Sequence, residues 1–162
     1  MVERTRFDDS ECPVGRSVDV IGDRWSLLVV RDAFDGCRRF GEFQRSLGAA
    51  KNILSTRLRD LVAAGVFEIV PASDGSAYRE YQLTPKGRDL FPVVVALRQW
   101  GEAHFFTPGE PRSELLDRRD GRHLDALRVR AADGRPLDPD DTVVAKVDPA
   151  GRVRGRAERA TP

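Results

Sequence analysis

The sequence has little cysteine and no long apolar run, and each absence excludes a class of protein. Two cysteines among 162 residues are too few for the disulfide framework of a small secreted domain. No stretch approaches the roughly 18 consecutive apolar residues of a membrane span, and the N-terminus lacks the apolar segment of a secretory signal. We therefore expect a cytoplasmic protein that does not bind a membrane.

Groups that carry catalysis or bind metals are also scarce. His104 and His123 are the only histidines; they are far apart and lack a cysteine or acidic cluster at ligand spacing. The sequence has no phosphate-binding loop, dinucleotide-binding glycine pattern or Ser-His-Asp arrangement. We predict that the protein is not an enzyme and uses neither a metal nor another cofactor.

Positive charge is concentrated in one short block, although the net charge of the chain is only +1. Residues 38–59 hold six basic residues and one acidic residue, whereas the preceding residues are net acidic. A local basic block on a nearly neutral chain is typical of a surface that binds nucleic acid. Chance fluctuation within so short a stretch is the alternative explanation.

Helix and strand patterns follow one another in the order of a winged helix-turn-helix. We expect helices over 13–21, 24–34, 40–47 and 51–64, a hairpin over 66–83, and one long helix from Pro85 to about 106. Proline favours the first turn of a helix at Pro13 and Pro85, and Gly65 supplies a helix stop. Two short helices joined by a tight turn and followed by a hairpin are typical of DNA-binding proteins.

The helix predicted over 51–64 has two unlike faces. Leu54, Leu58 and Leu61 recur at the spacing of a buried stripe. The polar residues of its other side are Lys51, Asn52, Ser55, Thr56 and Arg59. Asparagine can pair with adenine and arginine with guanine in the major groove, whereas Lys51 is better suited to a phosphate. An ordinary solvated helix face is the alternative interpretation.

Three further arginines are predicted to contact DNA outside that helix. Arg38 and Arg39 precede the third helix, and Arg79 is the only basic residue of the hairpin. Because contacts to phosphate release counterions, Arg38 and Arg39 would set the salt dependence of binding rather than its sequence preference. The hairpin tip at 73–76 has no lysine or arginine, so we expect its insertion into the minor groove to be weak.

Five short motifs occur along the chain: Cys-Pro at 12–13, Gly-Asp-Arg-Trp at 22–25, Arg-Arg-Phe at 38–40, Leu-Ser-x-Arg-Leu at 54–58 and Leu-Thr-Pro-x-Gly at 83–87. With these motifs in combination, the sequence resembles the HxlR family of winged-helix transcriptional regulators. The resemblance covers about residues 12–107. It implies a bacterial, MarR-like homodimer that binds double-stranded DNA at a roughly palindromic operator and either represses or activates transcription. The long helix after the hairpin is apolar on several sides, and we expect it to supply much of the dimer interface.

Cys12 matches the position of the sensing cysteine in redox-responsive members of that family. It precedes a helix started by Pro13, and amide donors and the helix dipole at such a place lower the pKa of a thiol. Two interpretations stay open: Cys12 is a redox or electrophile sensor, or it is a small residue without a switch role. A small-molecule effector bound between the long helix and the core is also compatible with the sequence. The family pattern does not require Cys37.

The C-terminal third contains an internal echo, DGRHLD at 120–125 and DGRPLD at 133–138. We expect each copy to form a tight turn between short strands, which makes residues 108–148 a small β-ribbon. It resembles a zinc ribbon whose four thiolate positions hold Asp117, Asp120, Arg130 and Asp133, so zinc is not expected. One hypothesis pairs Arg130 with Asp120 and Asp133 in place of the metal; independent Asp-Gly turns are the alternative. The basic tail at 149–162 is expected to be disordered.

The sequence as a whole predicts a mainly α (α+β) winged helix-turn-helix over 1–107, followed by the β-ribbon and the tail. The expected function is sequence-specific DNA binding as a homodimer. A winged-helix module that assembles proteins without specific DNA binding is the alternative. The basic block at 38–59 separates the two, because an assembly module has no need to concentrate positive charge there.

Overall fold

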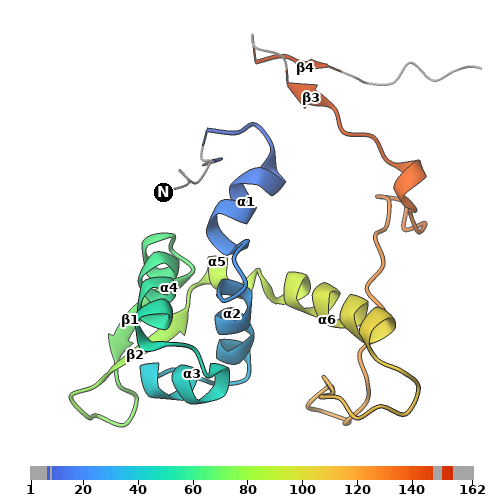
Figure 1. Ribbon diagram of the computed structural model, residues 1–162. Coiled ribbons are helices and arrows are strands. Elements are labelled where there is room, and N and C mark those ends of the chain that lie inside the picture. Colours follow the sequence, from blue (N-terminus) through green and yellow to red (C-terminus); the bar gives the residue numbers. More distant parts are fainter. Residues whose placement is uncertain (1–6, 8, 148–150, 155–162) are drawn as a thin grey trace, which may run out of the picture. The chain divides into compact units, whose positions relative to one another are not determined.

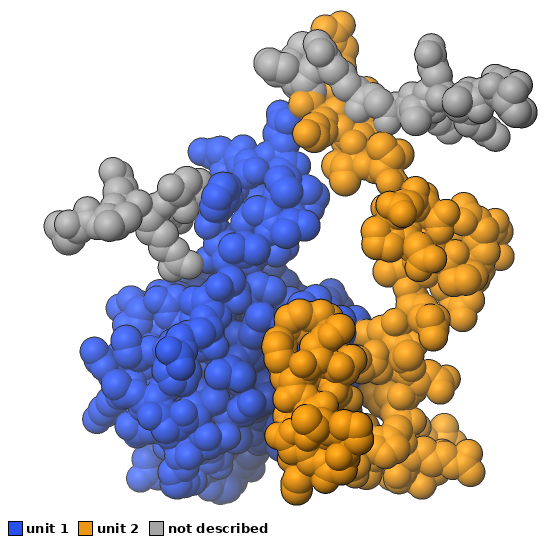
Figure 2. All heavy atoms as spheres, turned by 45° about the vertical axis from the view of Figure 1, so that its right-hand side comes forward, with its two compact units in different colours: residues 1–98 blue, residues 99–162 orange. Residues whose placement is uncertain are grey.

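The computed structural model describes residues 7, 9–147 and 151–154 (Figure 1). It divides into two compact units, Met1–Arg98 and Gln99–Pro162, whose boundary lies inside the last α-helix (Figure 2). The elements are α1 (Pro13–Ile21), α2 (Ser26–Phe34), α3 (Phe40–Leu47), α4 (Lys51–Ala63), β1 (Phe67–Pro71), β2 (Arg79–Leu83), α5 (Pro85–Arg88), α6 (Phe91–Phe105), the short 3-10 helix η1 (Pro139–Asp141), β3 (Lys146–Val147) and β4 (Val153–Arg154). No helix in these ranges is long and apolar enough to cross a membrane.

The first unit is a winged helix-turn-helix, as the sequence predicts. Helices α2, α3 and α4 pack together, and β1 pairs antiparallel with β2 to form the wing, with Phe67 opposite Leu83. Val29, Phe43 and Leu58 are completely buried at the centre of this unit. Burial of each such side chain contributes about 1.5–3 kcal/mol, which makes this core the main source of stability.

Local capping explains where the first two helices begin. Pro13 occupies the first turn of α1, and the Sγ of Cys12 accepts a hydrogen bond from the Gly15 amide at 3.5 Å. Asp23 accepts hydrogen bonds from the amides of Trp25 and Ser26 at 2.8 and 3.1 Å, just ahead of α2. Side-chain acceptors before a helix, here a sulfur and a carboxylate, satisfy amides that have no partner within it, and this fixes the starting points.

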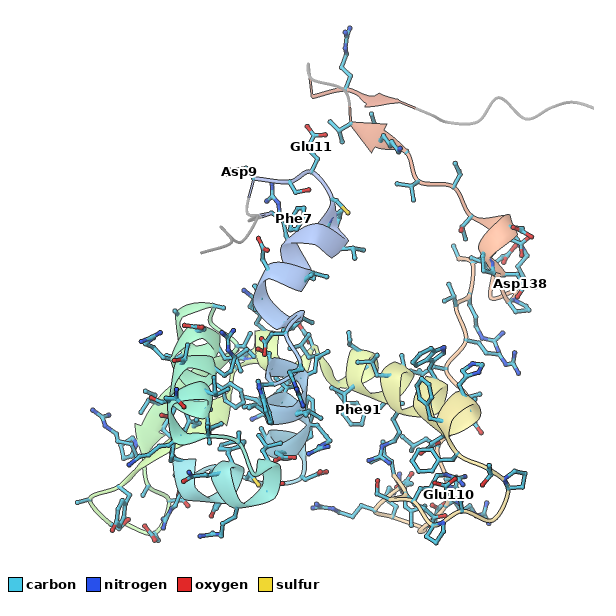
Figure 3. All side chains as sticks on the ribbon, viewed as in Figure 1. Phe7, Asp9, Glu11, Phe91, Glu110 and Asp138 are labelled. Atoms are coloured by element: carbon cyan, nitrogen blue, oxygen red, sulfur yellow. The ribbon has the colours of Figure 1, made fainter. Side chains whose placement is uncertain are left out.

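The single long helix predicted from Pro85 is wrong, because the structure has two helices there. α5 ends at Arg88, and α6 begins at Phe91 with Pro92 as its second residue. Proline has no amide hydrogen and disfavours helical conformation in the residue before it, so Pro92 is tolerated only at a new start. Phe91, labelled in Figure 3, lies at the start of α6. It packs edge to face on Phe34 of α2, with ring centroids 5.2 Å apart.

Two similar hairpin turns dominate the second unit. In the first, the Asp117 amide donates to the Arg122 carbonyl at 2.8 Å; in the second, the Ala131 amide donates to the Arg135 carbonyl at 2.9 Å. Each turn contains a glycine with positive φ, 71° at Gly121 and 87° at Gly134, which explains why Asp-Gly recurs. The tail at 149–162, predicted to be disordered, lies outside the described residues except for 151–154. In that stretch β4 pairs with β3.

The hypothesis that Arg130 replaces a metal ion between Asp120 and Asp133 is wrong. Arg130 donates to the carbonyl of Gly134 in its own turn, at 2.7 Å. Asp120 instead forms an ion pair with Arg122 at 3.8 Å, and Asp133 with Arg135 at 3.6 Å. Within the described part of the chain, no group of three or more His, Cys, Asp or Glu side chains could hold a metal ion.

Candidate nucleic-acid interface

The turn between α3 and α4 sets the angle at which α4 is presented. Gly48 ends α3 in a left-handed conformation with φ 60°, and its amide donates to the Gln44 carbonyl at 3.0 Å. Ala49 follows and is buried, which anchors the connection to the core. Leu54, Leu58 and Leu61 face inward, so the opposite side of α4 must face solvent.

The predicted base-contacting residues lie together on the outer side of α4. Lys51, Asn52, Ser55 and Arg59 are exposed, and Thr56 is half-buried. The Arg59 side chain is 74% exposed and forms an ion pair with its neighbour Asp60, at 3.5 Å. This face therefore offers an amide, hydroxyls and a guanidinium, the groups that recognise base edges in a major groove.

Arg57 does not belong to that outer face. Its Nη1 lies 3.3 Å from Asp23 and 3.6 Å from Asp60, and its side chain is only 23% exposed. It joins α4 to the residues that cap α2, which is a structural role. These two ion pairs favour a structural role for Arg57 over a contact with phosphate.

Arg39 is held by carboxylates of the wing. Its Nη2 lies 2.6 Å from Asp74 and 3.2 Å from Glu80, and its guanidinium lies 5.7 Å from the ring centroid of Tyr78. The hydrogen bond from Arg39 holds the pKa of Asp74 well below its usual range. In this arrangement the ion pairs of Arg39 connect the start of α3 to the wing. The sequence predicts a contact with phosphate for the same side chain.

Arg38 is more exposed than Arg39 and has a looser contact. Its side chain is 54% exposed, and its Nη1 lies 3.8 Å from the buried carboxylate of Glu80. The backbone amides of Arg38 and Arg39 donate to Glu42 at 2.7 and 2.9 Å, which lowers the pKa of Glu42. Glu42 thus fixes the backbone at the start of α3 and leaves the Arg38 side chain at the surface.

An open groove of about 550 Å³ lies between the start of α3 and the wing. Its lining residues are Arg39, Phe40, Gly41, Glu42, Arg45, Tyr78 and Arg79. Arg79 and Tyr78 are exposed on the wing, and Tyr78 keeps 69% of its surface accessible. Arg45 and Arg79 beside this groove suit a phosphate backbone, whereas Arg39 is already paired with Asp74 and Glu80.

Three residues of this region were missed by the sequence reasoning. The only sequence signal that Arg45 lies at this interface is its place in the basic block at 38–59. Tyr78 gave no signal beyond its place in a strand pattern. Glu80 is only 3% exposed, although a charged residue in a two-stranded hairpin is expected to face solvent. Its burial depends on Arg39 and on the hydroxyl of Ser73, which donates to it at 3.2 Å.

The two cysteines have different surroundings. Cys12 is exposed at the start of α1, and Cys37 is half-buried before α3. Burial, followed by the nearby carboxylates of Asp32, Glu42 and Asp35, raises the pKa of the Cys37 thiol. A raised pKa disfavours the reactive thiolate, so Cys37 is a poor nucleophile where it stands.

A second cavity of about 320 Å³ lies between α1 and the region where the wing and α5 begin. Val20, Ile21, Val66 and Leu90 form apolar walls, and Arg16, Ser17 and Lys86 add polar groups. An effector site between the long helix and the core is compatible with the sequence, and Lys86 and Leu90 of this cavity lie in the span predicted for that helix. The amine of Lys86 is already engaged with the Ala64 carbonyl at 2.7 Å.

Helices α3 and α4 with the following hairpin define a helix-turn-helix protein of the winged class. The HxlR-like helix-turn-helix family model matches residues 20–107, which is more than half of the chain. The chain therefore belongs to this family.

Relatives and solved structures agree with that assignment. An HTH-type transcriptional regulator of Mycobacterium tuberculosis is 46% identical over 112 residues, which cover 69% of this chain and 71% of the relative. The crystal structure of PA1607, described as a candidate transcription factor, is 56% identical, with a TM-score of 0.83 over 88% of this chain and 99% of that chain. The oxidized form of the redox regulator HypR is 34% identical, with a TM-score of 0.53 over 59% of this chain and 100% of that chain.

Proposed function

We propose that this protein is a homodimeric transcriptional regulator that binds a pseudo-palindromic operator in double-stranded DNA. The observation that carries the proposal is the outer face of α4, where Asn52, Ser55 and Arg59 are exposed while three leucines hold the helix in the core. Placed in the major groove, this face reads bases, and Arg38 and Arg79 bind the flanking phosphates. Lys51 joins the phosphate contacts, and Thr56 lies at the edge of the base-reading face.

Exposed apolar residues on two helices support the dimer. Val93, Leu97 and Trp100 follow one another along α6 at helical spacing and are 40%, 46% and 56% exposed. On α1, Val14 and Val18 are 69% and 45% exposed, and no residue of that helix is buried. Apolar surface of this extent favours association, and a two-fold axis would present two copies of α4 to two half-sites.

A salt titration tests the phosphate contacts of this proposal. For Arg38→Ala, the slope of log binding constant against log salt concentration should become less negative by about 2 per dimer, at roughly 0.9 for each lost phosphate contact. Preference for the operator over competitor DNA should change little, because phosphate contacts carry no base information. Arg88→Ala, an exposed arginine on α5, is the control and should keep the wild-type slope.

The binding assay uses purified protein and the intergenic DNA beside its own gene, with competitor DNA. Specific binding that saturates at one dimer per site supports the regulator. An unchanged salt slope in Arg38→Ala would remove Arg38 from the interface. No specific binding in either reduced or oxidised protein would favour the assembly module instead.

We propose further that Cys12 makes operator binding responsive to oxidants or electrophiles. The exposed thiol caps α1, a helix that carries dimer-contacting valines, so its modification can alter the dimer. Treatment with iodoacetamide should weaken operator binding at least tenfold in the wild type and in Cys37→Ser, but not in Cys12→Ser. Equal sensitivity of Cys12→Ser and wild type would exclude Cys12 as the sensor.

Two narrower proposals concern the remaining surface. The cavity between α1 and α5 is our candidate for an effector site, because its apolar walls and nearby cations suit a small molecule with an apolar body and an anionic group.

The C-terminal unit resembles a zinc ribbon without thiolates, and the two similar Asp-Gly turns support that likeness.

A further inference from the structure

Glu80 is a buried carboxylate in the wing. It lies on β2, opposite Val70 of β1, and is only 3% exposed. Its Oε1 accepts hydrogen bonds from Nε and Nη2 of Arg39, at 3.3 and 3.2 Å, and from the Ser73 hydroxyl at 3.2 Å. Its Oε2 is also buried and accepts no hydrogen bond from the residues that the structure describes. Arg39 is therefore the cation that compensates this buried charge.

Arg38 cannot take the place of Arg39 without rearrangement. Its Nη1 lies 3.8 Å from Glu80, which is longer than a hydrogen bond. Its backbone is fixed on both sides, since its amide donates to Glu42 at 2.7 Å and its carbonyl accepts from the Tyr81 amide at 2.8 Å. Loss of Arg39 would leave a buried carboxylate without a hydrogen-bonded cation, which is strongly unfavourable. Glu80 thus holds Arg39 more firmly than an exposed carboxylate could.

The second carboxylate on Arg39 is of that exposed kind. Asp74 lies 2.6 Å from Arg39 Nη2, but its side chain is 52% exposed. Exposed ion pairs are screened by salt and contribute little, so a phosphate group can replace Asp74. Of the two carboxylates, Glu80 is the one that decides where the Arg39 guanidinium lies.

The other arginines of this region are free to meet a DNA backbone at the surface. Arg45 and Arg79 are exposed and line the open groove between α3 and the wing, as Arg39 also does. The Arg39 side chain is 33% exposed, compared with 54% for Arg38 beside it. Its nitrogens are directed at carboxylates of the protein, and this sets Arg39 apart from its neighbours.

We propose that Glu80 withholds Arg39 from the DNA backbone and thereby limits the number of phosphate contacts that each subunit makes. The inference rests on the proposed function. A phosphate contact strengthens binding to every DNA sequence, so Glu80 lowers the affinity for operator and competitor DNA alike and makes both less sensitive to salt. Base preference stays with α4. Glu80 is a positioning residue, because it acts through Arg39 and does not itself touch DNA.

Glu80→Gln tests this role, because glutamine keeps the shape of the side chain and a hydrogen-bond acceptor but removes the charge. With Arg39 released, the slope of log binding constant against log salt concentration should become more negative by about 2 per dimer, at roughly 0.9 for each added phosphate contact. Preference for the operator over competitor DNA should not change. Glu68→Gln removes the same charge from an exposed position on β1 and, as the matched control, should keep the wild-type slope.

A purely structural role for Glu80 gives a different result. A lower melting temperature of Glu80→Gln with an unchanged salt slope would overturn the proposal. In Glu80→Gln/Arg39→Ala the slope should return to the wild-type value, and a slope as steep as in Glu80→Gln alone would show that the added contacts do not come from Arg39. Either contrary result leaves the proposed function intact if the wild type binds its operator. Absence of specific binding by the wild type would instead count against that function.

A measurement on the wild-type protein does not depend on the folding of a variant. Arg39 Nε–H donates to Glu80, and ¹H–¹⁵N spectra resolve the Nε–H groups of arginine side chains. In a titration with a duplex that lacks the operator, we expect the Arg79 signal to move and the Arg39 signal to keep its position. Equal movement of both signals would show that Arg39 leaves Glu80 for the backbone, contrary to the proposal.

Discussion

Arg59→Ala should abolish most of the preference for the operator while leaving the fold unchanged. A bidentate contact between arginine and guanine contributes about 1–3 kcal/mol of discrimination, and a dimer makes it in both half-sites. The expected loss of specific affinity is therefore about 2–6 kcal/mol, or roughly 30-fold to 10⁴-fold. Binding to competitor DNA should fall far less, because it depends mainly on phosphate contacts.

The fold should tolerate this change because Arg59 has few contacts to lose. Its side chain is 74% exposed, and its pair with Asp60 is an exposed one at 3.5 Å. Exposed ion pairs contribute less than about 1 kcal/mol, so the melting temperature should change little. The measurement is a competition titration against the operator, with Arg88→Ala as the matched loss of an exposed arginine. Wild-type affinity in Arg59→Ala would mean that another face of the protein reads the bases.

Local patterns were sufficient to predict the helix that carries Arg59. The stripe of Leu54, Leu58 and Leu61 depends only on helical spacing, and the structure buries all three. Gly65 ends the segment with φ 70°, a conformation that only glycine adopts at low cost. Features that depend on neighbours a few residues away can be read from a sequence directly.

The partners of Arg39 could not be predicted in the same way. Asp74 and Glu80 lie 35 and 41 residues further along the chain, and only the folded hairpin brings them to α3. In the sequence, Arg39 is simply half of a basic pair. The break between α5 and α6, in contrast, has a local signal in the sequence, which is Pro92. The apolar pattern on both sides of Pro92 nevertheless favoured one continuous helix.

The Leu-Thr-Pro-x-Gly motif at 83–87 has a structural reason that the sequence did not reveal. The Thr84 hydroxyl donates to the Gly65 carbonyl at 2.7 Å and accepts from the Gly87 amide at 3.1 Å. The Thr84 amide donates to the Val66 carbonyl at 3.1 Å. The motif thus attaches α5 to the end of α4 and the start of the wing, which links the recognition helix to the rest of the domain.

Gly87→Ala should destabilise the first unit by about 3 kcal/mol, the upper part of the usual range for an overpacked site. A β-carbon on Gly87 would lie 2.2 Å from the Val66 carbonyl oxygen and 2.9 Å from Leu83 Cδ2. The carbonyl cannot retreat without loss of its hydrogen bond to Thr84, and the Val66 amide is itself bonded to the Leu61 carbonyl at 2.9 Å. For a domain of this size, the melting temperature should fall by about 12–24 °C.

Gly41→Ala provides the control, because it adds the same methyl group where there is room. Gly41 lies inside α3, and the nearest atom to its new β-carbon is a guanidinium nitrogen of Arg45 at 3.9 Å. Alanine is a better helix former than glycine, so this variant should be as stable as wild type or up to about 1 kcal/mol more stable. Thermal unfolding followed by circular dichroism compares the two variants. Equal melting temperatures would show that α5 moves away from Val66 at no cost, and the motif would then not fix the end of α4.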